Sequence, residues 1–243
     1  MLKPVLLLSD LHLAEERAGS AAAFLAFAAG PAREARAVYI LGDLFDSWIG
    51  DDQLREPFAA AIAQALRGIT DAGVAVFVAR GNRDFLLGER FASVAGATLL
   101  AEETLADLGG VRTLLTHGDE LCTDDHAYQR YRAWMRDPVH QRRLLRLPYA
   151  LRRGIAAWMR RKSRSETARK PESILDVNAA AVEAALRRHR VTRMIHGHTH
   201  RPARHPLAVD GAACERIVLA DWDELGHYLE IGGEGIRAVD IPG

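Results

Sequence analysis

Short motifs rich in Asp, His and Asn recur along this chain, and each follows an apolar, β-branched run. There are five: Asp10-Leu11-His12, Gly42-Asp43, Gly81-Asn82, His117-Gly118-Asp119 and His196-Gly197-His198-Thr199-His200. Carboxylate and amide oxygens and imidazole nitrogens bind divalent cations such as Mn, Fe, Co, Zn and Mg. One such motif alone is an ordinary turn sequence. Five in this order, each after a predicted strand, indicate a metal site where strand ends converge.

The motifs offer enough ligands for two ions. Two-metal hydrolases hold their ions about 3.5–4 Å apart, where the ions stabilise the attacking and leaving oxygens of an in-line displacement. Ions that close need a bridging carboxylate, and Asp43 is the candidate. The predicted metal ligands are Asp10, His12, Asp43, Asn82, His117, His198 and His200.

Strand geometry predicts that the two ligands of one motif point to the same side of the strand. Because side chains alternate along a strand, we expect Asp10 and His12 to face the metals while Leu11 points into the core. The same argument covers the second pair and its intervening residue: His198, Thr199 and His200. His196 shares this parity but lies deeper, and we interpret it as a support for the ligands.

These motifs resemble those of the calcineurin-like metallophosphoesterases, whose pattern runs D-x-H, G-D, G-N, H-G and G-H-x-H. The sequence around them is similar to one branch of that family, which cleaves UDP-2,3-diacylglucosamine in bacterial lipid A synthesis. The similarity is clearest over residues 41–52, 81–88, 117–125, 176–178 and 196–202, and it runs over nearly the whole chain.

The resemblance implies an α/β fold, a β-sandwich of two mixed sheets flanked by helices. It implies that a hydroxide activated by two ions, Mn²⁺ in this branch, cleaves the pyrophosphate to UMP and 2,3-diacylglucosamine 1-phosphate. The catalytic residues would be Asp10, His12, Asp43, Asn82, Arg83 and His117. The substrate contacts would be Asn82, Arg83, Asp125, Ser163, Thr167, Lys170 and His198.

Arg83 marks a departure from the wider family. Many members carry a His after the Asn, and that His helps to protonate the leaving group. Arg83 takes its place in this chain, as in the diphosphatase branch. The general acid therefore stays open, although the guanidinium can still bind phosphate oxygens through two parallel hydrogen bonds.

Length and composition fit one globular enzyme domain. The chain has 243 residues, and 49% of them are hydrophobic, which can fill a sizeable core. The cysteines, Cys122 and Cys214, form no C-x-x-C motif, which fits a reducing compartment. The apolar run Val5–Leu8 is too short for a signal peptide, and Ala21–Ala32 is too short to span a membrane. We expect a cytoplasmic protein.

Hydrophobic patterning predicts alternating strands and helices. The expected strands are Val5–Ser9, Val38–Leu41, Val74–Ala79, Arg112–Thr116, Arg193–His196, Ile217–Ala220, Tyr228–Ile231 and Ile236–Ile241. The expected helices are Ser20–Ala29, Leu54–Ala72, Phe85–Ala95, Ala127–Met135, Leu144–Arg161 and Glu172–His189. Alternation in the first half predicts parallel strands joined by crossover helices, and the last three strands predict a meander.

Charge is unevenly distributed although the net charge is zero. Residues 130–170 contain 14 Lys or Arg and only two acidic residues, which leaves 18 basic and 30 acidic residues elsewhere. Leu151, Ile155, Trp158 and Met159 fall at i, i+4, i+7 and i+8, the spacing of one apolar helix face. We therefore expect a basic helical cap, residues 126–170, inserted within the single domain 1–243.

The cap has three interpretations. It could be a helix pair packed on the core, a nucleic-acid surface in which aromatic rings stack on bases, or a surface for anionic lipid and acyl chains. The resemblance favours the third. We expect a monomer bound peripherally to the cytoplasmic face of the inner membrane, with a UDP-linked lipid substrate and no nucleic-acid partner.

The end of the cap is the predicted substrate grip. Ser163, Thr167 and Lys170 fall at i, i+4 and i+7, on one helical face. Two other functions remain open. One is another phosphoesterase on the same core, such as a nuclease or a phosphoprotein phosphatase. The other is a non-catalytic scaffold, against which the complete set of seven ligands argues.

Overall fold

Strand β1 (Val5–Leu8) is apolar on both faces, and the computed structural model buries both. Val5 and Leu7 pack against a second sheet, whereas Leu6 and Leu8 pack against helices. Since side chains alternate along a strand, one continuous apolar run serves two layers. The structure describes residues 3–167, 174, 176–223 and 225–241, without the side chains of residues 162–167.

The first sheet has the strand order β11-β10-β1-β2-β3-β4. Strands β1 to β4 are parallel, as the alternation of strands and helices predicted, and β10 runs antiparallel to β1. The bounds of the other strands are β2 (Ala37–Leu41), β3 (Ala75–Ala79), β4 (Thr98–Leu99), β10 (Gly226–Gly232) and β11 (Gly235–Ile241).

The second sheet has the order β5-β6-β7-β9-β8. Its middle strands are parallel, and antiparallel hairpins close both edges. Its strands are β5 (Thr104–Leu108), β6 (Val111–Leu115), β7 (Arg193–His196), β8 (Ala203–Val209) and β9 (Ala212–Val218). The described residues thus form two mixed sheets packed face to face, which confirms the expected fold class.

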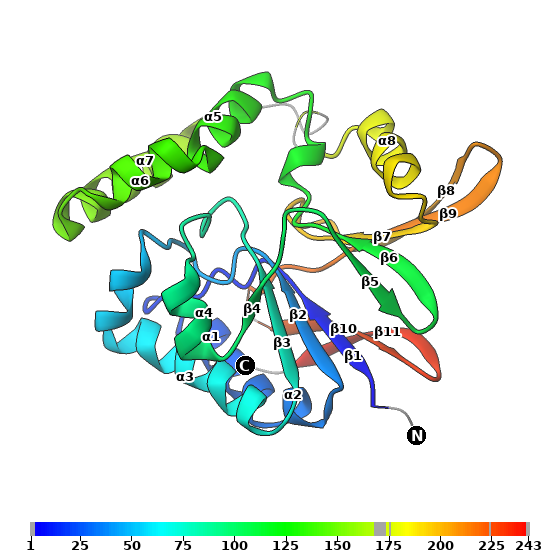
Figure 1. Ribbon diagram of the computed structural model, residues 1–243, viewed down its shortest axis with the longest axis horizontal. Coiled ribbons are helices and arrows are strands. Elements are labelled where there is room, and N and C mark those ends of the chain that lie inside the picture. The colour runs from blue at the N-terminus through cyan, green and yellow to red at the C-terminus, as the bar shows by residue number, and fades with distance from the viewer. Residues whose placement is uncertain (1–2, 168–173, 175, 224, 242–243) are drawn as a thin grey trace.

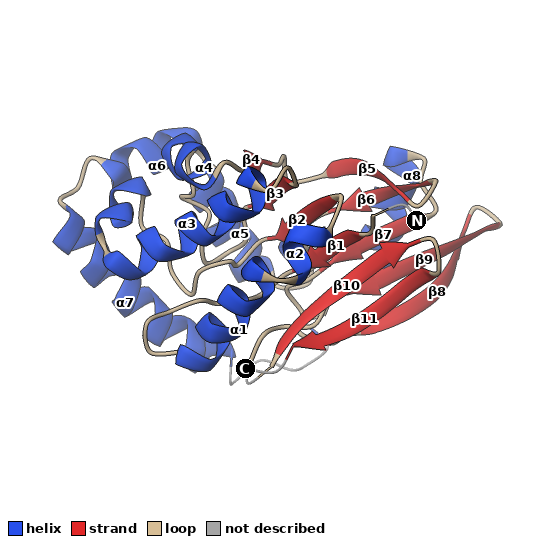
Figure 2. Ribbon diagram, turned by 90° about the horizontal axis from the view of Figure 1, so that it is seen from below, coloured by secondary structure: helices blue, strands red, loops and turns tan. Residues whose placement is uncertain are grey.

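Helices cover both outer faces (Figure 1, Figure 2). The first sheet is covered by α1 (Ala18–Ala29), α2 (Pro31–Glu34), α3 (Pro57–Asp71) and α4 (Glu89–Ala95). The second sheet is covered by α8 (Ala179–His189). A further layer lies above the carboxyl ends of the strands and consists of α5 (His126–Arg136), α6 (Pro138–Leu145) and α7 (Tyr149–Thr167).

Several predicted helices begin later or break earlier than the sequence suggested. The helix predicted over Leu144–Arg161 is two helices, because Pro148 lacks an N–H and interrupts the hydrogen-bond ladder. The helix predicted from Leu54 begins at Pro57, where proline is favoured in the first turn. The one predicted from Phe85 begins at Glu89.

The last predicted helix is also shorter than expected. Helix α8 begins at Ala179, where the side chain of Asn178 accepts the backbone N–H of Ala181 at 3.1 Å. This capping hydrogen bond explains why the helix begins there, because an Asn side chain satisfies a free backbone donor of the first turn. Three of the residues predicted to precede it, 172, 173 and 175, lie outside the described part of the chain.

The predicted meander of the last strands is wrong. Strand β9 belongs to the second sheet, and the hairpin β10–β11 belongs to the first. Between them the chain crosses from one sheet to the other, and Trp222 donates its backbone N–H to the carbonyl of Asp10 at 3.1 Å. Strands β4, β5 and β8 were not predicted.

No helix in the described ranges is both long and apolar enough to cross a lipid bilayer.

Candidate metal centre

All five sequence motifs lie at one edge of the sandwich, where β1, β2, β3, β6 and β7 end (Figure 1). Glycines let the loops approach closely at this edge. A Cβ on Gly81 would lie 2.1 Å from Asp43 Oδ1, and a Cβ on Gly197 would lie 2.2 Å from Asp10 Oδ2. A larger residue at either position would displace a candidate ligand.

The backbone of the ligand loops is strained. Five candidate ligands have a positive φ: Asp10 (55°), His12 (47°), Asp43 (52°), His198 (68°) and His200 (53°). Residues other than glycine rarely adopt this region, and such strain concentrates at functional sites. These loop conformations, and not strand alternation, direct the paired ligands to one side. The strands end at Leu8 and His196, so the predicted alternation is wrong, although Leu11 is buried in the core as expected.

Asp10, His12 and His200 form one group of converging ligand atoms. Asp10 Oδ1 lies 3.4 Å from His200 Nε2 and 4.0 Å from His12 Nε2, and the two imidazole nitrogens lie 3.3 Å apart. Asp10 Oδ1 and His12 Nδ1 are buried and make no hydrogen bond within the described structure. Buried polar atoms without partners are costly, and a cation bound by Asp10 Oδ1 would give that oxygen a partner.

A second group forms around Asn82. Its Oδ1 lies 3.0 Å from His117 Nε2 and 2.8 Å from His198 Nδ1. Asp43 lies between the two groups. Its Oδ1 is 3.8 Å from His117 Nε2, and its Oδ2 is 3.8 Å from His12 Nδ1. One carboxylate therefore faces both groups, as a bridging ligand must.

The electrostatics of the metal-free centre draw protons onto two imidazoles. Burial lowers the pKa of His117, but the charges of Asp43 and Asp10 outweigh burial and raise it to about 9. Burial also opposes the charging of His200, yet the neighbouring carboxylates of Asp10 and Asp221 raise its pKa to about 10. For His12 and His198 burial dominates and lowers the pKa to about 4 and about 3. The buried carboxylates thus stabilise positive charge in the centre, and divalent cations would supply that charge.

The residues present fit a pair of divalent cations. The structure brings all seven predicted ligands together, and their donors are oxygen and nitrogen atoms of the types that Mn, Fe, Co, Zn and Mg accept. His196 lies behind them, fully buried. Its Nδ1 is 2.8 Å from the Gly197 carbonyl, and its Nε2 is 3.3 Å from Arg216.

Asp84 is an important residue that the sequence analysis did not identify. It is fully buried, and its carboxylate accepts the backbone N–H groups of both the Asp43 loop and the Asn82 loop. Its position two residues after Asn82 was the available signal. An Asp in such a loop has the same pattern as an ordinary turn residue, so the pattern alone did not separate the two.

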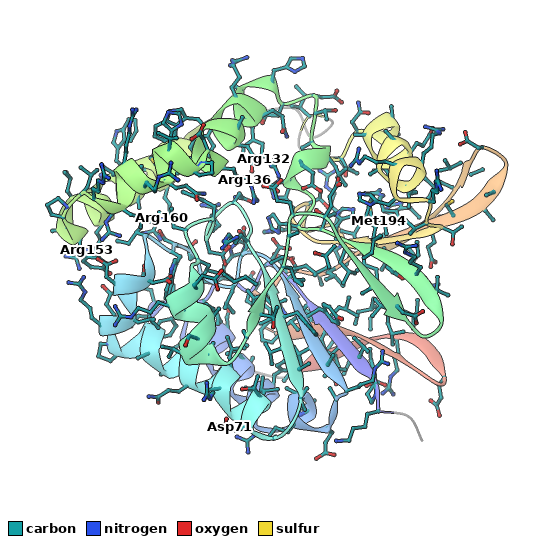
Figure 3. The ribbon with its side chains drawn as sticks, in the orientation of Figure 1. Asp71, Arg132, Arg136, Arg153, Arg160 and Met194 are labelled. Carbon is teal, nitrogen blue, oxygen red and sulfur yellow. The ribbon has the colours of Figure 1, made fainter. Side chains whose placement is uncertain are left out.

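Helix α5 is fixed to the metal centre through Asp119. Arg132 donates to Asp119 at 2.9 Å, and Arg136 does so at 3.4 Å; both side chains point from α5 toward the core (Figure 3). Tyr128 donates its hydroxyl to the same carboxylate at 2.7 Å, and its ring lies 5.9 Å from that of His198. Asp119 is two residues after His117, so this cluster joins α5 to the loop of a candidate ligand.

A cavity of about 500 Å³ lies between the α5–α7 layer and the core. Asn82 and Arg83 belong to its lining, and Arg83 Nε is buried without a hydrogen bond in the described structure. The remaining wall is largely apolar and includes Trp48, Phe85, Leu86, Met135, Leu144, Ile155, Trp158 and Met159. Arg160 of α7 forms an ion pair with Asp46, and both residues line the cavity. The predicted apolar stripe is divided: Ile155 and Met159 line the cavity, whereas Leu151 and Trp158 are 51% and 57% exposed.

The structure separates the predicted substrate contacts. Asn82, Arg83 and His198 lie at the metal centre, whereas Asp125 caps α5 by accepting the backbone N–H of Tyr128 at 3.0 Å. The backbone of Ser163 and Thr167 belongs to α7, but their side chains, and Lys170 altogether, lie outside the described residues.

Comparison with known proteins identifies the family of the chain. The profile of the calcineurin-like phosphoesterase family matches residues 3–202. A UDP-2,3-diacylglucosamine hydrolase from Pseudomonas paraeruginosa is 49% identical over 238 residues, 98% of this chain and 99% of that protein. Another from Pseudomonas putida is 47% identical, over 96% of this chain and 97% of its own. The solved structure of a dimetal phosphatase from Danio rerio is 14% identical, with a TM-score of 0.51 over 99% of each chain, and supports the fold alone. The chain belongs to the calcineurin-like phosphoesterase family.

Proposed function

We propose that this protein hydrolyses the pyrophosphate bond of UDP-2,3-diacylglucosamine to UMP and 2,3-diacylglucosamine 1-phosphate. The observation that carries the proposal is the cavity of about 500 Å³, whose lining joins Asn82 and Arg83 to a largely apolar wall. A substrate with a phosphate group and acyl chains likewise has one polar part and one apolar part. The similarity to UDP-2,3-diacylglucosamine hydrolases along nearly the whole chain supports the same substrate.

The metal centre would hold two ions, and we propose Mn²⁺. Asp10, His12 and His200 would bind one, Asn82, His117 and His198 the other, and Asp43 both. Bound divalent ions would supply Lewis-acid charge and lower the pKa of a bound water, so that no side-chain base is required. This two-ion arrangement is consistent with the family to which the chain belongs.

The chain's own residues would bind and orient the substrate. Arg83 has a buried Nε free for a phosphate oxygen, and its guanidinium can donate two parallel hydrogen bonds. Asn82 and His198 would contact the same phosphate region. Asp125, Ser163, Thr167 and Lys170 would contribute further contacts near the end of the cap. The apolar wall would exclude water from the acyl chains.

We also propose that residues 126–170 form an inserted cap that docks on an anionic membrane. Large apolar side chains are exposed on it: Trp134, Val139, Leu145, Leu151 and Trp158. They lie in the stretch with 14 basic residues and two acidic ones between residues 130 and 170. Basic residues attract anionic headgroups by about 1 kcal/mol each near the surface. The protein would act as a monomer on the cytoplasmic face of the inner membrane, without a nucleic-acid partner.

A substrate comparison tests the function. Purified protein is supplied with Mn²⁺ and offered UDP-2,3-diacylglucosamine, single-stranded nucleic acid or a phosphopeptide. We expect release of UMP from the first only, and loss of that activity when a chelator removes the metal. Faster cleavage of nucleic acid or phosphopeptide would favour the alternative, a nuclease or phosphoprotein phosphatase on the same core.

A further inference from the structure

Asp221 is outside every sequence motif, yet it contacts a candidate metal ligand. Its Oδ2 lies 3.1 Å from Nδ1 of His200, while Nε2 of the same ring lies 3.4 Å from Asp10 Oδ1. The imidazole therefore lies between two carboxylates, one on the metal side and one on the outer side. A metal-binding imidazole needs one bare nitrogen, and the partner of the other nitrogen decides which one is bare.

Backbone hydrogen bonds on both sides of Asp221 hold this residue in place. Leu219 donates its N–H to the carbonyl of His196 at 2.8 Å, and Trp222 donates its N–H to the carbonyl of Asp10 at 3.1 Å. Trp222 is fully buried, and its indole donates to the carbonyl of His227 at 2.7 Å. The segment is thus held between the two loops that carry Asp10 and His200.

His200 needs such support more than the buried ligands do. Its side chain is 38% exposed, whereas that of His117 is 2% exposed and has its Nδ1 fixed 2.8 Å from the carbonyl of Leu41. His200 also has a φ of 53°, so its backbone is strained. An exposed ring on a strained backbone keeps one orientation only if something holds its outer nitrogen.

We propose that Asp221 is a positioning residue for His200: its carboxylate accepts a hydrogen bond from the Nδ1–H of His200, so that Nε2 faces the ion shared with Asp10 and His12. This inference rests on the proposed metal centre. It predicts an asymmetric effect, because only the ion held by His200 depends on Asp221. The ion at Asn82, His117 and His198 does not.

Metal titration of the metal-free protein tests this. With Mn²⁺ followed by electron paramagnetic resonance, we expect wild type to bind two ions. Asp221→Asn should bind one of them about 10–100-fold more weakly, and Asp221→Ala at least as weakly as Asp221→Asn. The Mn²⁺ concentration for half-maximal activity should rise by the same factor, with the KM for substrate unchanged.

Asp223→Asn is the matched control. Asp223 is two residues away, is 87% exposed and pairs with Arg17 at 3.2 Å. The Asp223→Asn variant should bind both Mn²⁺ ions with the affinity of wild type. The inference would be overturned if Asp221→Asn bound both Mn²⁺ ions with wild-type affinity. It would also be overturned if Asp221→Asn and Asp223→Asn lost affinity for Mn²⁺ equally. Wild-type protein that takes up no ion would overturn the metal centre itself. Melting curves of the metal-free variants identify any variant that fails to fold, and Asp221→Asn is the milder change.

Discussion

Two buried carboxylates, Asp43 and Asp84, lie side by side, and one holds the backbone of the other: Asp84 Oδ1 accepts the N–H of Asp43 at 3.3 Å. The same oxygen accepts the N–H of Gly81 at 2.7 Å, and Oδ2 accepts the N–H of Leu44 at 2.8 Å. Asp84 thus ties together the loop of the candidate bridging ligand and the loop that carries Asn82.

Asp84→Asn should destabilise the protein and weaken metal binding. Each carboxylate oxygen of Asp84 accepts backbone donors, so either orientation of an amide would place its NH₂ group against N–H groups. Leaving buried donors unsatisfied costs roughly 1–3 kcal/mol each, so we expect a loss of roughly 2–4 kcal/mol in the free energy of unfolding. Urea denaturation measures it. Asp71→Asn, on the exposed surface of α3 (Figure 3), should change stability by less than about 0.5 kcal/mol. Equal stability of the two variants would refute this role for Asp84.

Metal affinity should rise with pH. The pKa values of His117 and His200 are raised to about 9 and about 10, so each imidazole must lose a proton before it binds an ion. We expect the affinity for Mn²⁺ to rise about tenfold per pH unit for each proton displaced, between about pH 6.5 and about pH 8.5. Calorimetry in buffers of different ionisation enthalpy counts the protons. An affinity independent of pH would contradict the ligand assignment.

The stability of the metal-free protein should show the opposite sign. A group whose folded pKa lies above its unfolded value stabilises the fold below the unfolded pKa and loses that effect as pH rises through the folded pKa. Both imidazoles are of this kind, so their contribution should fall from about pH 7 to about pH 10. Thermal denaturation with and without Mn²⁺ separates the two effects.

Ser163→Ala and Lys170→Ala should impair the lipid substrate selectively. If these residues contact the nucleotide sugar, each substitution removes a hydrogen bond worth about 1.5–3 kcal/mol when one partner is charged, which corresponds to about 10–100-fold in kcat/KM. Turnover of a small generic phosphodiester should be unchanged at equal metal content. Ser165→Ala, at a position outside the i, i+4, i+7 pattern, is the control. Equal losses on both substrates, or none on either, would show that the end of the cap does not bind the substrate.

Binding to anionic vesicles should be sensitive to salt. Surface attraction is screened within about 8 Å at physiological ionic strength, so co-sedimentation should fall steeply as salt rises. Trp134→Ala should also reduce binding, because this exposed side chain lies on the cap. Leu25→Ala removes an apolar side chain of comparable exposure, 44% against 45%, from outside the cap and should have no effect. Binding that ignores both salt and lipid charge would argue against the charged cap as the docking surface.

The sequence was sufficient to select the candidate ligand cluster, because few residue types can bind a divalent cation. All seven candidate ligands come together although the argument from strand alternation failed at Asp10 and His12. Positive φ values depend on the tertiary contacts of each loop, and the sequence pattern does not encode them locally.

Contacts between segments that are distant in the sequence could not be predicted from the sequence. Asp221 approaches His200 only because the chain crosses between the sheets near Trp222, a path that the expected meander excluded. Parallel strands β1 to β3 were predictable, since their apolar runs alternate with helices. Strand β8 was not, because it is a largely exposed edge strand that contains Pro206.

The most direct test of the account is a parallel measurement of metal content and UDP-2,3-diacylglucosamine hydrolysis in wild type and Asp43→Ala. Asp43 faces both ligand groups, and two dications so close repel each other strongly without a shared carboxylate. The account predicts two Mn²⁺ ions and UMP release for wild type. For a folded Asp43→Ala it predicts the loss of at least one ion and of hydrolysis. A folded Asp43→Ala variant with two ions and normal turnover would contradict it.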